Sequence, residues 1–129
     1  MKEIIATDRA PKAIGPYSQA VKLGNLLFTS GQVPLDPRSG QMVTGDIKAQ
    51  VRRVMDNLRE ILEASGTSLD HVLKTTCYLR NMDDFSAMNE VYADYFPKTP
   101  PARSCIQAAR LPRDCDVEID AIAVVPPVS

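Results

Sequence analysis

The sequence predicts a single α/β domain in which two helices cover one face of a β-sheet. The chain has 129 residues, which is typical of one compact domain. Hydrophobic residues make up 44% and charged residues 24% of the chain, proportions that exclude a disordered protein. Two segments repeat apolar residues at helical spacing, and several short apolar runs between Gly and Pro residues are typical of strands. No linker or internal repeat divides the chain, so residues 1–129 are expected to form one domain.

The first predicted element is a β-hairpin of residues 18–23 and 26–30. Gly24-Asn25 joins its two apolar runs, and such a pair supplies the positive φ that a two-residue turn needs. The next segment, residues 31–45, is rich in Pro, Gly and Asp. It is therefore predicted to be an ordered loop.

Two amphipathic helices are predicted after this loop. The first begins near Ile47, where Asp46 can cap it, and ends at Gly66, which enters the left-handed conformation easily. The second ends before Pro97. The apolar stripe of the first helix is Val51, Val54, Met55, Leu58, Ile61 and Leu62, and that of the second is Phe85, Met88, Tyr92, Tyr95 and Phe96.

Three further strands are predicted, at residues 73–80, 102–108 and 117–125. In the first of them, Leu73, Thr75, Cys77 and Leu79 share the more apolar face. The last strand is apolar on both faces, because Ile122 and Val124 lie on the same face as Glu118 and Asp120. Two helices cover only one face of a sheet, so a partner subunit is expected to cover the other.

Composition excludes several classes of function. The net charge is −1, which leaves no positive field for a nucleic-acid backbone. No apolar run reaches the length of a signal-peptide core or a membrane span, so a cytoplasmic protein is expected. Cys77, Cys105 and Cys115 form no Cys-x-x-Cys pair and the chain has one histidine, His71. Neither a disulfide framework nor a metal site is indicated.

Arg103 and Glu118 are the candidate functional residues. Arg103 follows two prolines at the start of a strand and is suited either to a carboxylate ligand or to an ion pair with an acidic residue. Glu118 lies between Val117 and Ile119. It is suited either to pairing with a basic residue or to handling water, because burial would raise its pKa. These residues alone leave both choices open.

The remaining candidates have simple structural explanations. Cys105 has no nearby histidine in the sequence that would activate it, so we expect a small buried side chain, and we expect His71 in a loop or cap. The glycines at both ends of the hairpin, Gly15 and Gly31, are explained by turn geometry. The hydroxyl residues beside them could line a small polar pocket.

Six segments of the chain resemble the RidA/YjgF family. The segments are GPYSQA (15–20), FTSGQVPLDP (28–37), VLKTTCYL (72–79), FSAMNEVYADYFP (85–97), PPARSCIQAARLP (100–112) and VEID (117–120). They occur in order and cover essentially the whole chain. Cys115 departs from the family pattern, in which an alanine or other aliphatic residue is expected, and this concerns only the packing of its loop.

The resemblance implies a mixed sheet of about six strands with a chorismate mutase-like arrangement, and a homotrimer with a sheet-lined centre and sites between subunits. It implies a cofactor-independent deaminase that hydrolyses short 2-imino acids, released as 2-aminoacrylate-type enamines, to 2-keto acids and ammonia. Arg103 matches the carboxylate-binding arginine and Glu118 the glutamate that orients water. Further pocket positions match Tyr17, Ser30, Gly31, Asn89 and Cys105, the last through its backbone.

Two other functions remain open at this point. One is a small-carboxylate or 2-keto acid sensor, which needs Arg103 but no water-handling Glu118. The other is the ribonuclease or translation-inhibitor activity described for some family members. Against it stand the net charge of −1 and the 5% of aromatic residues, which supply neither a phosphate track nor a stacking platform.

Overall fold

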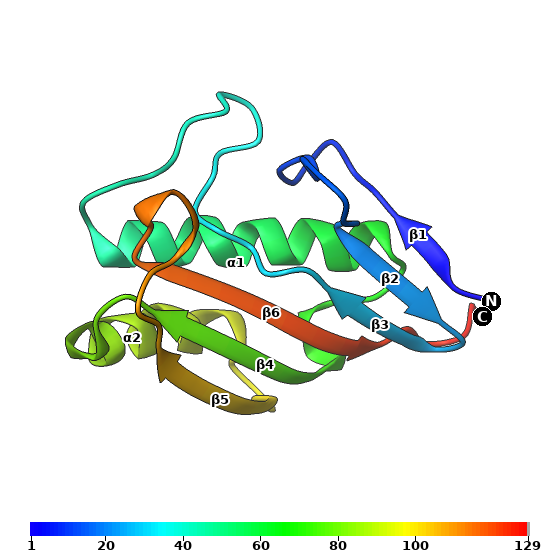
Figure 1. Cartoon of the computed structure of the whole chain (residues 1–129). Helices are drawn as coiled ribbons and strands as arrows, with labels where there is room; N and C mark the ends of the chain where they lie inside the picture. The colour runs from blue at the N-terminus through cyan, green and yellow to red at the C-terminus, as the bar shows by residue number, and fades with distance from the viewer. Residues whose placement is uncertain (129) are drawn as a thin grey trace.

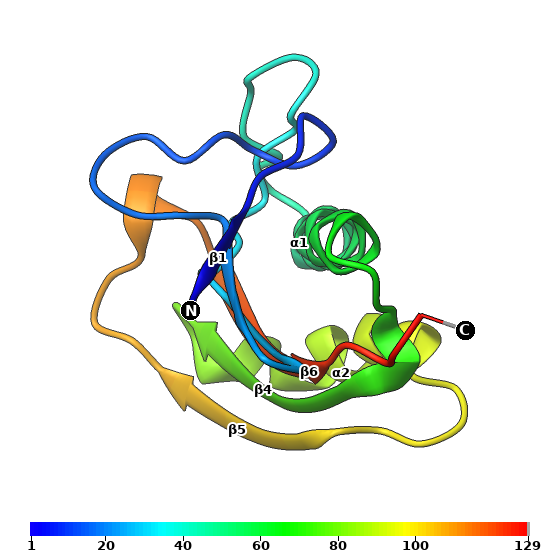
Figure 2. The same ribbon diagram turned by 90° about the vertical axis from the view of Figure 1, so that its right-hand side faces the viewer.

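The computed structural model describes residues 1–128. One six-stranded mixed sheet, in the order β1-β2-β3-β6-β4-β5, packs against two helices. The strands lie in front of both helices in Figure 1, and the quarter turn of Figure 2 shows the helices together on one side of the sheet. The elements are β1 (Glu3–Ile5), β2 (Ala20–Leu23), β3 (Leu26–Thr29), α1 (Ile47–Ala64), β4 (Val72–Leu79), α2 (Phe85–Tyr95), β5 (Ala102–Gln107) and β6 (Val117–Val124). The predicted fold class is confirmed.

The last strand of the chain lies in the middle of the sheet. β6 pairs antiparallel with both β3 and β4, whereas β4 and β5 run parallel. Helix α2 forms the crossover that a parallel pair requires. The turn of the predicted hairpin is confirmed, since Leu23 pairs with Leu26 and Gly24 has a φ of 61°.

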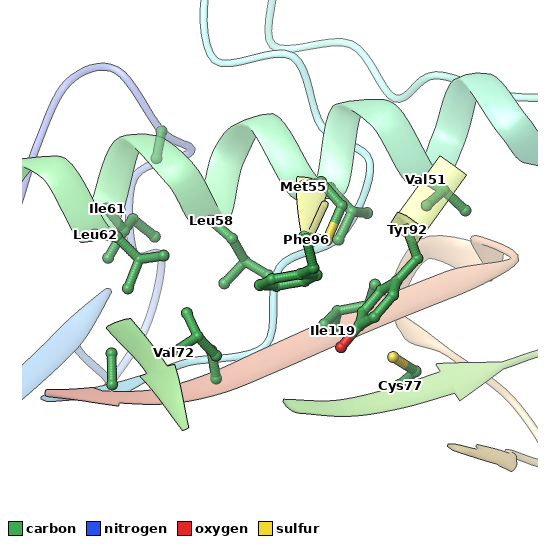
Figure 3. Close-up of a cluster of buried hydrophobic side chains, with 14 of the residues drawn as sticks. Val51, Met55, Leu58, Ile61, Leu62, Val72, Cys77, Tyr92, Phe96 and Ile119 are labelled. Carbon is green, nitrogen blue, oxygen red and sulfur yellow. The ribbon is translucent and has the colours of Figure 1, made fainter. Parts of the chain in front are cut away.

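The hydrophobic core lies between the sheet and the helices. Figure 3 shows apolar side chains of α1 meeting Tyr92 and Phe96 from the α2 region and Ile119 from β6. The predicted stripe of α1 is fully buried, as are the alternate β6 residues Val117, Ile119, Ala121 and Ala123. The helix ends are as predicted, because Asp46 accepts a hydrogen bond from Lys48 N and Gly66 has a φ of 87°.

Three details differ from the sequence prediction. β1 is not predicted, because its three residues give too short a pattern. Val91 is buried on α2 but is absent from the predicted stripe. Leu73 is 49% exposed rather than buried, because a register shift between Val72 and Lys74 moves it to the other face of β4.

The face of the sheet away from the helices is open in the protomer and exposes several large apolar side chains. Leu23, Leu26, Phe28 and Ile106 are exposed large hydrophobic residues. Ile122 and Val124 lie on the same face of β6 and are half-buried. The two-sided apolar character predicted for the last strand is therefore present in the structure.

Candidate active site

Arg103 lies on the helix side of the sheet. Its register partner on β4 is Thr75, which is buried and shares a hydrogen bond of 2.7 Å with the hydroxyl of Tyr92 on α2. The guanidinium carbon of Arg103 lies 4.9 Å from the Tyr92 ring centroid and 5.3 Å from that of Phe85. Arg103 Nη1 donates a 2.7 Å hydrogen bond to Asn89 Oδ1. The two rings and the amide hold the guanidinium in one orientation.

The Arg103 cavity has unused hydrogen-bond donors. It has a volume of about 510 Å³ and is lined by Asn89, Tyr92, Ala93, Phe96, Pro100, Pro101 and Arg103. Within residues 1–128, the Arg103 side chain forms no ion pair and no hydrogen bond other than that to Asn89. The ion-pair explanation for Arg103 is therefore wrong within the protomer, and its remaining N–H groups are free to bind a carboxylate.

Glu118 lies against Gly31 in a second cavity. A Cβ atom placed on Gly31 would overlap the Glu118 carboxylate and lie 2.8 Å from its Cδ. Gly31 does not have a positive φ, so the prediction that turn geometry explains this glycine is wrong. The side chain at position 31 must be absent because the carboxylate of Glu118 occupies that space.

A change of register brings Gly31 beside Glu118. Phe28 pairs with Ile122, and Gln32 forms a bridge with Ile119, so the first segment contains one extra residue. Thr29 Oγ1 accepts the hydrogen bond of Ala121 N across this irregularity. Such bulges redirect the chain next to functional sites. Pairing across a bulge cannot be recognised from alternating hydrophobicity.

Tyr17, Ser30 and Gly31 line the same cavity as Glu118. The cavity has a volume of about 520 Å³. Ser30 Oγ donates a 2.5 Å hydrogen bond to Ser18 O, which ties the two ends of the hairpin together. The two ends of the hairpin therefore line one cavity, although most of its lining is apolar rather than polar. The structure adds Lys12 and Arg113 to the lining, two exposed cations that sequence reasoning did not select.

The surroundings of Glu118 favour the protonated form of its carboxyl group, compared with the same group in water. Burial raises the pKa of Glu118, and the nearby charge of Asp120 raises it further. In the described part of the chain Glu118 has no ion pair, so the alternative role as the partner of a basic residue is wrong within the protomer. A half-buried carboxylate with a raised pKa suits a group that accepts and returns a proton.

Arg103 and Glu118 lie on opposite faces of the sheet. Val117 and Ile119 are buried under the helices, and side chains alternate along a strand, so Glu118 points away from the helices. Arg103 points toward them, and the two cavities have no lining residue in common. One protomer therefore carries two separate half-sites: Arg103 with Asn89, and Glu118 with Tyr17, Ser30 and Gly31.

Cys105 belongs to the Arg103 side of the sheet but is not an activated nucleophile. Burial raises the pKa of its thiol. His71 precedes β4, whereas Cys105 pairs with Cys77 six residues further along, so the histidine cannot act as its base. Cys115 packs normally, since it is buried and its Sγ donates to Val117 O.

Replacing Cys105 with alanine should leave most of any activity of the site intact. The change removes a protonated thiol and leaves the β5 backbone in place, so we expect less than about a tenfold loss in kcat/KM. Turnover with mass spectrometry of the intact chain checks this. A covalent adduct trapped on Cys105 during turnover, together with complete loss in Cys105→Ala, would contradict it.

Residues 1–128 contain neither a metal-ligand cluster nor a membrane-spanning helix. No group of three or more His, Cys, Asp and Glu side chains there is arranged to hold a metal ion. No helix in that range has both the length and the apolar composition needed to cross a bilayer.

The fold defines a class of small α/β proteins in which two helices cover one side of a mixed sheet. A family model described as Endoribonuclease L-PSP matches residues 7–125. The chain belongs to this family, which is also called RidA/YjgF.

Relatives cover almost the full length of the chain. A RutC family protein of Pyrococcus horikoshii is 57% identical over 95% of this chain and 98% of its own. A 2-iminobutanoate/2-iminopropanoate deaminase of Escherichia coli is 46% identical over 96% of this chain and 98% of its own. The crystal structure of E. coli TdcF with bound serine is 46% identical, has a TM-score of 0.91 and covers 95% of this chain and 98% of that one.

Proposed function

We propose that the protein is a cofactor-independent deaminase that hydrolyses short 2-imino acids such as 2-iminobutanoate and 2-iminopropanoate. Water adds to the C=N bond, and the products are a 2-keto acid and ammonia. The observation that carries the proposal is the pair of half-sites, one with a free guanidinium and one with a half-buried carboxylate of raised pKa. The deaminase relative and the serine-bound relative support a small ligand that carries a carboxylate.

The complete site, in this proposal, forms between two copies of the chain. Arg103 and Glu118 of one protomer lie on opposite faces of its sheet and cannot reach one small substrate. The apolar face with Leu26, Phe28 and Ile106 supplies a surface for another copy. A closed ring of three copies, the homotrimer, would join each Arg103 half-site to the Glu118 half-site of a neighbour.

The roles of the residues follow from their surroundings. Arg103, held by Asn89 and the two rings, binds the substrate carboxylate through two parallel hydrogen bonds and fixes C2 in place. Glu118 of the neighbouring copy accepts a proton from the water that attacks C2. It then returns the proton to the nitrogen, which takes a second proton from the hydroxyl of the tetrahedral intermediate as the C=O bond forms and ammonia leaves. The three free thiols agree with the proposed cytoplasmic location, where thiols stay reduced.

The test is hydrolysis of an imino acid made in the reaction mixture. An amino-acid oxidase generates the 2-imino acid, and formation of the 2-keto acid and ammonia is followed with and without the protein. We expect faster hydrolysis than in water, and a loss of at least about 10²-fold in this acceleration with Glu118→Gln. Binding of the keto acid without acceleration would instead identify a carboxylate sensor. Cleavage of RNA without imine hydrolysis would identify the ribonuclease activity that the family description names.

Replacing Arg103 with lysine should weaken both substrate binding and turnover. Lysine keeps the charge but loses the planar fork and the bond to Asn89. A charge-assisted hydrogen bond is worth roughly 1.5 to 3 kcal/mol, so the affinity for a 2-keto acid and kcat/KM should both fall by about one to two orders of magnitude. Calorimetry and initial rates measure the two effects. The matched control is Arg52→Lys, at an exposed arginine 3.5 Å from Asp94, which should change neither quantity.

A further inference from the structure

Asp120 is a second carboxylate on the same side of the sheet as Glu118. The two residues are separated by one position on β6, so their side chains leave the strand in the same direction, about 7 Å apart along it. Both are half-buried. Asp120 forms no ion pair among the residues that the structure describes. The hydroxyl of Tyr78 lies 3.4 Å from Asp120 Oδ2, and hydrogen bonding from Thr76, its register partner on β4, also favours the Asp120 carboxylate.

Across residues 1–128, Asp120 has no ion-pair partner, although it lies on the same face as large apolar side chains. Further along β6 the same face carries Ile122 and Val124, and Phe28 lies beside Ile122 in the register. Burial disfavours the charged form of Asp120, and hydrogen bonds from Tyr78 and Thr76 and the charge of Lys74 offset this only in part. A carboxylate at this unfavourable position is explained if its charge acts on the neighbouring Glu118.

We propose that Asp120 is a positioning residue that sets the pH at which Glu118 gains and loses its proton. The inference rests on the proposed deaminase function and adds a residue to it. Two carboxylates at this separation resist simultaneous ionisation, and the half-buried position reduces screening by water. The charge of Asp120 thereby brings the pKa of Glu118 closer to neutral pH. A group that must both accept and return a proton works best with such a pKa.

Other charged and titratable groups surround the Glu118 and Asp120 carboxyl groups, and two of them favour the charged form of Asp120. Tyr78 on β4 faces Glu118 in the register and donates to Asp120, which favours the Asp120 carboxylate and so maintains its charge. Lys74 on β4 also lowers the pKa of Asp120, although burial raises it overall. Lys12, Tyr17 and Arg113 line the Glu118 cavity from the loops. Cys115, before β6, is a buried thiol whose pKa is raised to about 11, so it stays neutral.

The experiment compares the wild type with Asp120→Asn and Asp120→Glu. We expect the acidic limb of the kcat/KM profile, which reports ionisation of Glu118 in the free enzyme, to move to lower pH in Asp120→Asn. The shift should be between a few tenths of a unit and about one unit. Asp120→Glu keeps the charge and should restore the wild-type limb. Keto-acid affinity at neutral pH should be the same in all three proteins.

A second measurement reads Glu118 without any turnover. The titration of ¹³C-labelled Glu118, assigned by its loss in Glu118→Gln, should show a lower pKa in Asp120→Asn than in the wild type. Superimposable titrations would overturn the proposal, as would an equal loss of activity at every pH that Asp120→Glu does not restore. If neither the wild type nor the two variants accelerate imine hydrolysis, the proposed deaminase function is wrong. The NMR titration still decides whether Asp120 raises the pKa of Glu118.

Discussion

Glu118→Gln should reduce turnover of a 2-imino acid by about 10² to 10⁴ while leaving 2-keto acid binding nearly unchanged. Glutamine has nearly the same shape but cannot take a proton from water. Keto-acid binding depends on Arg103, which lies on the other face of the protomer's sheet and is contacted by Asn89 and not by Glu118. Initial rates give the first quantity and calorimetry the second.

The same substitution should not destabilise the fold. Burial raises the pKa of Glu118, so the folded state disfavours the charged carboxylate relative to the unfolded chain. A neutral amide avoids that cost, and thermal unfolding at neutral pH should give an unchanged or higher Tm for Glu118→Gln. Full activity in this variant would show that Glu118 is structural and would remove the water-handling group from the mechanism.

Gly31→Ala should reduce turnover nearly as strongly, although the change adds only one methyl group. The new Cβ would overlap the Glu118 carboxylate, so Glu118 must rotate away from its position in the cavity. A displacement of about 1 Å at a catalytic group can cost on the order of 10²-fold in rate. The affinity for a 2-keto acid should change much less than the rate.

A double-substitution cycle separates this steric effect from general damage to the loop. In the Glu118→Ala background the space beside position 31 is empty, so adding Gly31→Ala should cause little further loss of stability or activity. The two substitutions would then be strongly non-additive. Additive losses, or an unchanged rate in Gly31→Ala alone, would show that the contact between Gly31 and Glu118 does not position the carboxylate.

The sequence was sufficient to predict the elements that a repeating pattern specifies. The α1 stripe, the alternation along β6 and the Gly24-Asn25 turn are each determined by neighbours in the chain, and the structure confirms them. Leu73 was placed on the wrong face because a bulge interrupts the alternation. β1 was missed because three residues carry too little pattern.

The sequence alone selected Arg103 and Glu118 as candidates, the family resemblance supplied their roles, and the structure supplied their arrangement. Neither the two half-sites nor the contact of Gly31 with Glu118 can be predicted from local spacing, because each depends on pairing between distant segments. Arg113 was missed for a similar reason. It is an exposed arginine with a φ of 56° in a turn beside the cavity, and nothing in its local sequence marks it.

The most direct test of the central claim is to mix two inactive variants. Arg103→Ala retains the Glu118 half-site, and Glu118→Gln retains the Arg103 half-site. If each site takes Arg103 from one copy and Glu118 from its neighbour, an equal mixture should recover about a quarter of wild-type activity. Arg103 is intact in half of the copies and Glu118 in the other half, so about one site in four receives both. Sedimentation equilibrium should first show assemblies of three chains of 14.2 kDa.

The control for this mixing experiment is the double variant Arg103→Ala/Glu118→Gln. The double variant has neither Arg103 nor Glu118. It cannot supply the residue that either single variant lacks, so no activity should return when it is mixed with either of them. Recovery with the two single variants, and none with the double variant, is the result that the account predicts. No recovery in assemblies shown to contain both single variants would contradict a site shared between copies.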